Sequence, residues 1–179
     1  MRLLLDTNVL IDYFGRREPH FCDCTRLLTA AWFGDVELWA SAKSFTDIFY
    51  LLARACGRAE LQQSFIRSLS VLKICSIDGR DIEAAAGESW QDFEDCLISR
   101  AAEKIGADFI LTRDVRGFER SRVRALSPGA FFEWLRNERH LEYMDIDVFG
   151  RPLACAVTCE KDAHPIALTD DEVATSRGV

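Results

Sequence analysis

The chain has 179 residues, 49% of them hydrophobic and 28% charged, which is typical of one globular domain that can bury a core. Its net charge of −7 excludes binding of nucleic acid through overall positive charge, so any such contact needs a local basic patch. It has seven cysteines, no secretory signal and no apolar run of membrane-spanning length, so we expect a cytoplasmic protein with free thiols and no membrane partner.

Short apolar runs alternate with helical patterns along the chain, as in the βαβ units of a parallel sheet. We expect strands at 2–6, 36–40, 73–77, 109–112 and 123–125. We expect helices at 8–14, 20–33, 44–56, 58–71, 79–87, 92–105 and 128–138. These elements predict an α/β fold with a five-stranded parallel sheet flanked by helices.

Capping residues mark several of the predicted helix ends. Ser44 and Asp92 each stand three residues before an acid, a loose capping box at a helix start. Ser127-Pro128 supplies an N-cap followed by proline at the first helical position. Gly57 and Gly106 fall where helices end with a glycine cap.

The composition changes near the end of the last predicted helix. Residues 137–179 contain nine acids and four Lys or Arg, so this segment carries −5 of the net charge. We therefore divide the chain into a domain at 1–136 and an acidic C-terminal extension at 137–179. The extension is expected to be irregular, with one hairpin within 143–158.

Four acids are predicted to converge on one edge of the sheet. Asp6 and Asp114 end strands, and Asp47 and Asp95 lie in the first turns of helices. Strand carboxyl ends and helix N-termini face the same edge in this fold class, where ligands bind. Clustered carboxylates repel one another unless a cation lies between them. Asp47 and Asp95 also fit a simpler role, in which they complement helix dipoles.

Such a cluster favours a hard cation with oxygen ligands, Mg²⁺ or Mn²⁺. A divalent ion activates water and screens phosphate charge, so the pattern indicates metal-dependent phosphodiester hydrolysis. Structural zinc is disfavoured, because Cys22-x-Cys24 and Cys155-x3-Cys159 have no matching second ligand pair. Ten dispersed glycines, with no G-x-G-x-x-G, argue against a dinucleotide-binding enzyme.

The ordered motifs Asp6-Thr-Asn-Val-Leu-Ile-Asp12, Ser44-Phe-Thr-Asp47, Asp92-Phe-Glu-Asp95 and Thr112-Arg-Asp114 resemble the PIN-domain family, the VapC-like toxin ribonucleases. The resemblance covers about residues 1–136. It implies a divalent metal held by Asp6, Asp95 and Asp114, cleavage of RNA, and a separately encoded antitoxin as partner. Asp47 stands where the family usually has Glu, which shortens that side chain by one methylene.

Further residues are expected to support these acids. Thr7, Asn8 and Thr112 are predicted to hydrogen-bond Asp6 or the waters of the metal, and Asp92 to cap a helix or join the cluster. Asp12, inside the first helix, is expected to be exposed. The predicted RNA contacts are three arginines near Asp114, which equally fit a solvated loop: Arg113, Arg116 and Arg120.

The leading hypothesis is a metal-dependent endoribonuclease, the toxin of a toxin–antitoxin pair, that acts as a homodimer. One alternative is a catalytically weak PIN-like domain that binds RNA or protein. A second is a phosphatase of the haloacid-dehalogenase type with Asp6 as nucleophile. That class requires an acid two residues after the nucleophile, where this chain has Asn8. Aromatic residues at helical spacing are assigned to the core or to a dimer contact: Phe45, Phe49, Phe131, Phe132 and Trp134.

Overall fold

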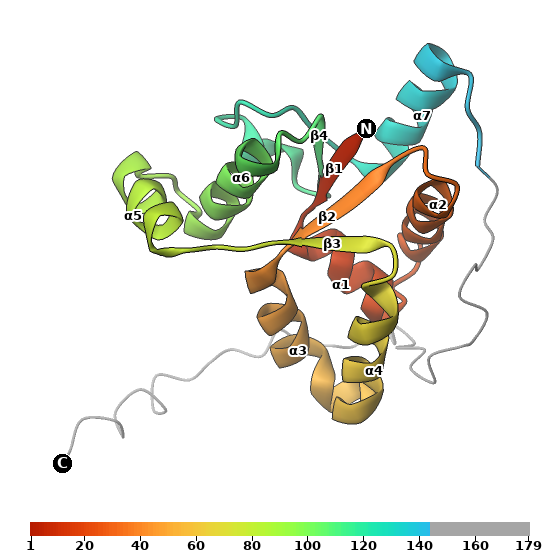
Figure 1. Ribbon diagram of the computed structural model, residues 1–179, viewed down its shortest axis with the longest axis horizontal. Helices are drawn as coiled ribbons and strands as arrows, with labels where there is room; N and C mark the ends of the chain where they lie inside the picture. Colours follow the sequence, from red (N-terminus) through yellow and green to blue (C-terminus); the bar gives the residue numbers. More distant parts are fainter. Residues whose placement is uncertain (144–179) are drawn as a thin grey trace.

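The computed structural model describes residues 1–143 of the chain (Figure 1). Its strands are β1 (Arg2–Leu5), β2 (Glu37–Ser41), β3 (Leu72–Cys75), β4 (Phe109–Leu111) and β5 (Ala125–Leu126). Its α-helices are α1 (Thr7–Gly15), α2 (Phe21–Trp32), α3 (Ala42–Cys56), α4 (Arg58–Ser68), α5 (Gly79–Glu88), α6 (Phe93–Ile105) and α7 (Pro128–Arg139). One 3-10 helix, η1 (Val115–Phe118), follows β4.

The five strands form one parallel sheet in the order β3-β2-β1-β4-β5, which confirms the predicted fold class. Alternate residues of each strand enter different cores, because side chains of a strand point to opposite faces. Leu3 and Leu5 pack with α1, α2, α3, α4 and α7 on one face. Leu4 and Ile110 pack with α6 on the other face, and α5 packs beside α6.

The strand order reverses at β1. The chain moves outward from β1 to β2 and β3, and then crosses back to place β4 on the other side of β1 (Figure 1). In parallel α/β sheets the crevice at such a reversal, outside the carboxyl ends of the strands, is where ligands bind. The residues that directly follow β1 and β4 are Asp6 and Thr112.

Most of the predicted element boundaries fall within two residues of those observed, and α3 shows why one cap was wrong. The helix begins at Ala42, because Ser41 at the end of β2 caps it by accepting a hydrogen bond from the Lys43 amide. Ser44, the predicted cap, is fully buried inside the helix. Asp47 consequently lies beyond the first turn of α3. The predictions also missed η1.

The packed region continues past α7 to Tyr143. This side chain is 9% exposed, packs against Phe132, and donates a hydrogen bond of 2.5 Å to Asp35 Oδ2. The hairpin predicted within 143–158 lies outside the described residues except for Tyr143 itself. No helix in residues 1–143 combines the length and hydropathy needed to cross a bilayer.

Candidate active site

Asp6 is held rigidly at the carboxyl end of β1. Its side chain is 5% exposed, and Oδ1 accepts a hydrogen bond from the Thr7 amide at 2.6 Å, which caps α1. Oδ2 accepts from Asn8 Nδ2 at 2.6 Å and from Thr112 Oγ1 at 2.7 Å. Thr112 Oγ1 also accepts from the amide of Asp114 at 3.0 Å. The predicted support of Asp6 by Asn8 and Thr112 is therefore present, and it links β1 to the loop after β4.

Asp95 and Asp114 approach each other over Gly117. Asp95 lies in the first turn of α6, and Asp114 caps η1 by accepting a hydrogen bond of 3.2 Å from the Gly117 amide. A Cβ atom built on Gly117 would lie 2.3 Å from Asp95 Oδ2 and 3.3 Å from Asp114 Oδ2. The glycine thus leaves room for two carboxylate oxygens beside its backbone.

The electrostatics identify these carboxylates as one cluster. Burial, and then the neighbouring charges of Asp92, Asp6, Asp114 and Glu94, raises the pKa of Asp95 to about 7. Burial raises the pKa of Asp6 to about 6, against hydrogen bonds that lower it, and the charges of Glu94 and Asp114 add to the increase. Among the described residues no Lys, Arg or His forms an ion pair with Asp6, Asp95 or Asp114.

These residues fit a hard divalent cation. The three carboxylates repel one another without a positive partner, and the space beside Gly117 admits oxygen ligands from two of them. Within residues 1–143 no group of three His, Cys, Asp or Glu side chains is arranged to hold a metal ion by itself. An ion here therefore depends on water or substrate oxygens for part of its coordination, as Mg²⁺ commonly does.

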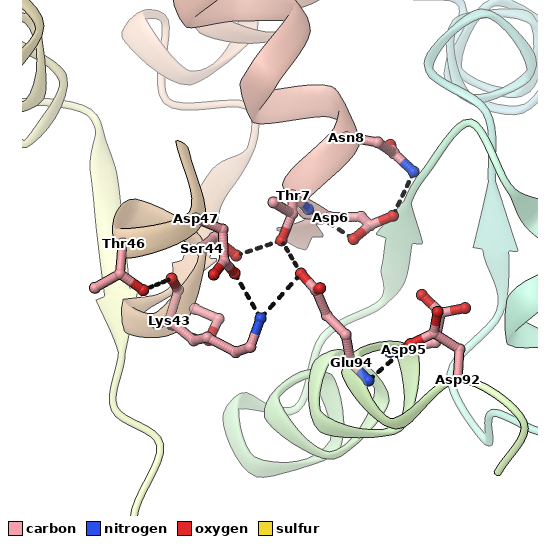
Figure 2. Close-up of polar contacts among 11 residues, drawn as sticks. Asp6, Thr7, Asn8, Lys43, Ser44, Thr46, Asp47, Asp92, Glu94 and Asp95 are labelled. Atoms are coloured by element: carbon pink, nitrogen blue, oxygen red, sulfur yellow. Dashed lines mark hydrogen bonds and ion pairs between the residues drawn. The ribbon is translucent and has the colours of Figure 1, made fainter. Parts of the chain in front are cut away.

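Asp47, the fourth predicted acid, is engaged differently. Its Oδ2 forms an ion pair of 2.5 Å with Lys43 Nζ, one helical turn earlier in α3. The same Nζ lies 3.2 Å from Glu94 Oε1, and Thr7 Oγ1 donates to that oxygen at 3.0 Å (Figure 2). The structure thus pairs Asp47 with a lysine and brings in Glu94, neither of which was predicted.

Two signals in the sequence pointed to this network. Lys43 and Asp47 have the i, i+4 spacing of a helical ion pair. Glu94 stands inside the motif that supplied Asp92 and Asp95. The motif's acids divide by role in the structure: Asp92 caps α6 by accepting hydrogen bonds from the amides of Glu94 and Asp95 at 2.8 and 3.2 Å.

Asp12 is buried, at 1% exposed, so the expectation of an exposed side chain was wrong. The reason is that α1 is enclosed on most of its circumference, and Arg113 reaches Asp12 from the loop after β4. Arg113 Nε lies 3.0 Å from Asp12 Oδ2, and the Arg113 amide donates to Asn8 Oδ1 at 3.1 Å. Burial raises the pKa of Asp12, which the charge of Arg113 opposes.

A groove of about 620 Å³ opens beside the acids, and its walls include Trp90, Asp95, Asp114, Arg116 and Arg120. Arg120 donates hydrogen bonds of 3.0 and 2.8 Å to the carbonyls of Ser89 and Glu88, and its guanidinium lies over the Trp90 ring. Arg116 forms no ion pair with a described residue. Of the three predicted RNA contacts, Arg116 is therefore the one in the groove whose guanidinium forms no ion pair within residues 1–143.

Comparisons with known proteins place this geometry in a family. The sequence profile of the PIN domain matches residues 2–116. A chain of "VapBC2 from Rickettsia felis bound to a DNA fragment from their promoter" has a similar fold, with 17% identity and a TM-score of 0.55, over 71% of this chain and 98% of that chain. A search of curated proteins found no match.

Two further solved structures match less closely. Mycobacterium tuberculosis VapC20, described as a Sarcin-Ricin loop cleaving toxin, has 20% identity and a TM-score of 0.48, over 60% of this chain and 86% of that chain. FitAB bound to an IR36 DNA fragment has 19% identity and a TM-score of 0.48, over 70% of this chain and 94% of that chain. The profile match includes all four predicted acids, from Asp6 to Asp114, and spans more than half of the sequence. The chain belongs to the PIN domain family.

Proposed function

We propose that this protein is a divalent-metal-dependent endoribonuclease. The observation that carries the proposal is the set Asp6, Asp95 and Asp114, which meet at the strand-order reversal and form no ion pair with a base of residues 1–143. Burial and the neighbouring acidic charges raise the pKa of Asp6 and of Asp95. A protein gains no stability from such a cluster, because burial and the neighbouring acids make the charged forms of Asp6 and Asp95 unfavourable. Retention of the cluster is explained if a cation binds there.

Each residue has a definite task in this proposal. Asp95 and Asp114 would hold Mg²⁺ or Mn²⁺. Asp6 would add a third negative charge beside the ion, and its carboxylate is kept in place by hydrogen bonds from Thr112 and Asn8. When bound, the ion supplies a Lewis acid that activates water and neutralises phosphodiester charge. Arg116, in the groove, would bind an RNA phosphate.

We further propose an antitoxin partner and a homodimer. The family resemblance supports the antitoxin, and the Rickettsia felis structure of similar fold is a VapBC assembly.

A catalytically weak RNA-binding or protein-binding module is the second candidate. It is favoured by one observation, the ion pair that holds Asp47 on Lys43 rather than leaving it in the acid cluster.

The test is cleavage of a mixed RNA pool by metal-stripped protein, with Mn²⁺ or with EDTA. We expect cleavage with Mn²⁺, none with EDTA, and none in Asp6→Asn or Asp95→Asn. Glu83→Gln, an exposed acid on α5, is the matched control and should cleave like wild type. Bound Mn²⁺ with no cleavage of any RNA would favour the binding module instead.

A further inference from the structure

A lysine ammonium bridges two acids at the crevice. Lys43 Nζ lies 2.5 Å from Asp47 Oδ2 and 3.2 Å from Glu94 Oε1, so a single ammonium joins a carboxylate of α3 to a carboxylate of α6. The lysine side chain is 31% exposed. Its three N–H donors exceed the two carboxylates it faces, which leaves one for an oxygen of a bound substrate.

The crevice is therefore divided into two adjacent halves of unequal charge. Glu94 belongs to the lysine-bound half and is the chain neighbour of Asp95, which has no cationic partner. Thr7, the chain neighbour of Asp6, donates a hydrogen bond to Glu94 Oε1 and marks the boundary (Figure 2). The other half contains Asp6, Asp95 and Asp114, none of which forms an ion pair with a base in the part of the chain that the structure describes, whereas the lysine-bound half is already neutralised in part.

Many nucleases bridge a phosphodiester with two metal ions, one near the attacking oxygen and one near the leaving oxygen. We propose that in this chain the Lys43 ammonium takes the place of the second divalent ion, so that the crevice binds one divalent ion per chain. The inference rests on the proposed nuclease function and adds the number of ions and the residue that sets it. Lys43 would contribute positive charge toward the RNA phosphate but no activated water.

A simpler reading is an ordinary i, i+4 ion pair that only stabilises α3. The contact to Glu94 argues against it, because that residue lies on another helix and shares a hydrogen bond with Thr7. The proposal also explains why position 47 has Asp rather than Glu. The shorter acid leaves space for a lysine head group between α3 and α6, where a longer Glu side chain would reach farther across.

The experiment is calorimetric titration of the full-length protein with Mn²⁺, checked by counting bound Mn²⁺ with electron paramagnetic resonance. Wild type is expected to bind one ion. Lys43→Met, which removes the charge, is expected to bind two. Lys43→Met combined with Asp47→Asn is expected to return to one, and Lys43→Arg, which keeps the charge, is expected to stay at one.

Lys104→Met is the matched control. Lys104 also bridges two acids, Asp78 at 3.2 Å and Asp81 at 2.8 Å, and it lies outside the crevice. This variant is expected to gain no ion, and a gain would overturn the proposal by showing that any acid pair freed of lysine binds Mn²⁺. One ion in both wild type and Lys43→Met, or two in wild type, would also overturn it.

Failure of the proposed function has a different signature. If wild type binds no Mn²⁺ and cleaves RNA in EDTA, the metal-dependent nuclease itself is wrong. If wild type binds one ion and cleaves, and Lys43→Met still binds one, only the role of Lys43 is wrong. Circular dichroism of each variant separates loss of the ion from loss of the fold.

Discussion

At the scale of single residues, the acid cluster reduces the stability of the protein that carries it. Asp95 has a pKa of about 7 in the folded chain and an ordinary value of 3.8 without the fold. Between those values the folded state binds more protons than the unfolded state, so the free energy of unfolding falls as the pH rises from about 4 to about 7. Above about pH 7 ionisation of Asp95 lowers the free energy of unfolding no further.

We therefore expect Asp95→Asn to stabilise the metal-free protein at pH 8 and to have little effect at pH 4. The gain should be about 1 to 2 kcal/mol, since solvent screening at this half-buried side chain reduces the full linkage effect. Urea denaturation in EDTA at the two pH values measures it. Glu83→Gln serves as the control, and an equal gain in both variants, or a loss in Asp95→Asn, would contradict the prediction.

The buried Asp12 of α1 pairs with the exposed Arg113, which lies in the loop that carries Asp114. Asp12→Ala leaves Arg113 without its carboxylate, and we expect the free energy of unfolding to fall by about 2 kcal/mol, less than for a fully buried pair. Mn²⁺ affinity should fall as well, because the loop loses an anchor. Chemical denaturation and calorimetry measure the two effects.

The control for Asp12→Ala is Glu142→Ala, which removes an exposed ion pair with Arg136. Its effect on the free energy of unfolding should be within about 0.5 kcal/mol. Equal effects of the two substitutions would show that the Asp12–Arg113 pair is no more than a surface contact.

The sequence predicted residues at strand ends better than residues within helices. Asp6 follows directly from the position where an apolar run stops, and Thr112 and Asn8 from their neighbourhood. Asp114 was expected to end a strand, but β4 ends at Leu111 and Asp114 instead caps η1. Lys43, Glu94 and the burial of Asp12 depend on which side of α3, α6 or α1 faces the crevice. That orientation is set by tertiary packing and not by local pattern.

At the scale of elements, η1 positions Asp95 and Asp114 through one glycine. Gly117→Ala would place a methyl group 2.3 Å from Asp95 Oδ2, so the carboxylate must move, while the fold can adapt because only the end of a side chain is displaced. We expect Mn²⁺ affinity to fall on the order of tenfold, about 1.4 kcal/mol. Calorimetry measures it.

Gly87→Ala is the matched control for this substitution, because nothing lies within 4 Å of its added Cβ. It should leave Mn²⁺ affinity unchanged. If Gly117→Ala also leaves the affinity unchanged, the space beside Gly117 is not where the ion binds.

The end of the described chain is a structural part of the domain. Tyr143 packs on Phe132, its carbonyl accepts a hydrogen bond of 3.1 Å from Arg26 Nε, and its hydroxyl binds Asp35. Tyr143→Ala should lower the free energy of unfolding by about 3 kcal/mol, as loss of a buried aromatic ring does. Tyr143→Phe should cost about 1 kcal/mol.

Thermal and urea unfolding of both Tyr143 variants test this packing, and no loss in Tyr143→Ala would contradict it.

The domain boundary at residue 136 stays a prediction. The change in composition placed this boundary at the end of the last predicted helix. The packing of Tyr143 beyond it was not predicted, because a single aromatic residue in an acidic segment is a weak signal of burial. The order of the strands and α-helices was predictable, because apolar runs mark most of the strands, whereas η1 was missed.

At the scale of the whole molecule, the topology of the sheet brings acidic side chains together. The sheet reverses its order at β1, and at that reversal lie Asp6, Asp95 and Asp114, whose carboxylates form no ion pair within residues 1–143. The protein is acidic overall, with a net charge of −7, so the RNA binding that we propose requires a local attraction. A bound cation and Arg116 would supply it beside the groove.

The most direct measurement is anomalous diffraction from a crystal of the full-length protein grown with Mn²⁺. The account predicts a manganese peak coordinated by Asp95 and Asp114, next to the Asp6 carboxylate that Thr112 holds. Ordered Mn²⁺ bound elsewhere, or an empty crevice at saturating Mn²⁺, would contradict the claim that these acids form a metal centre.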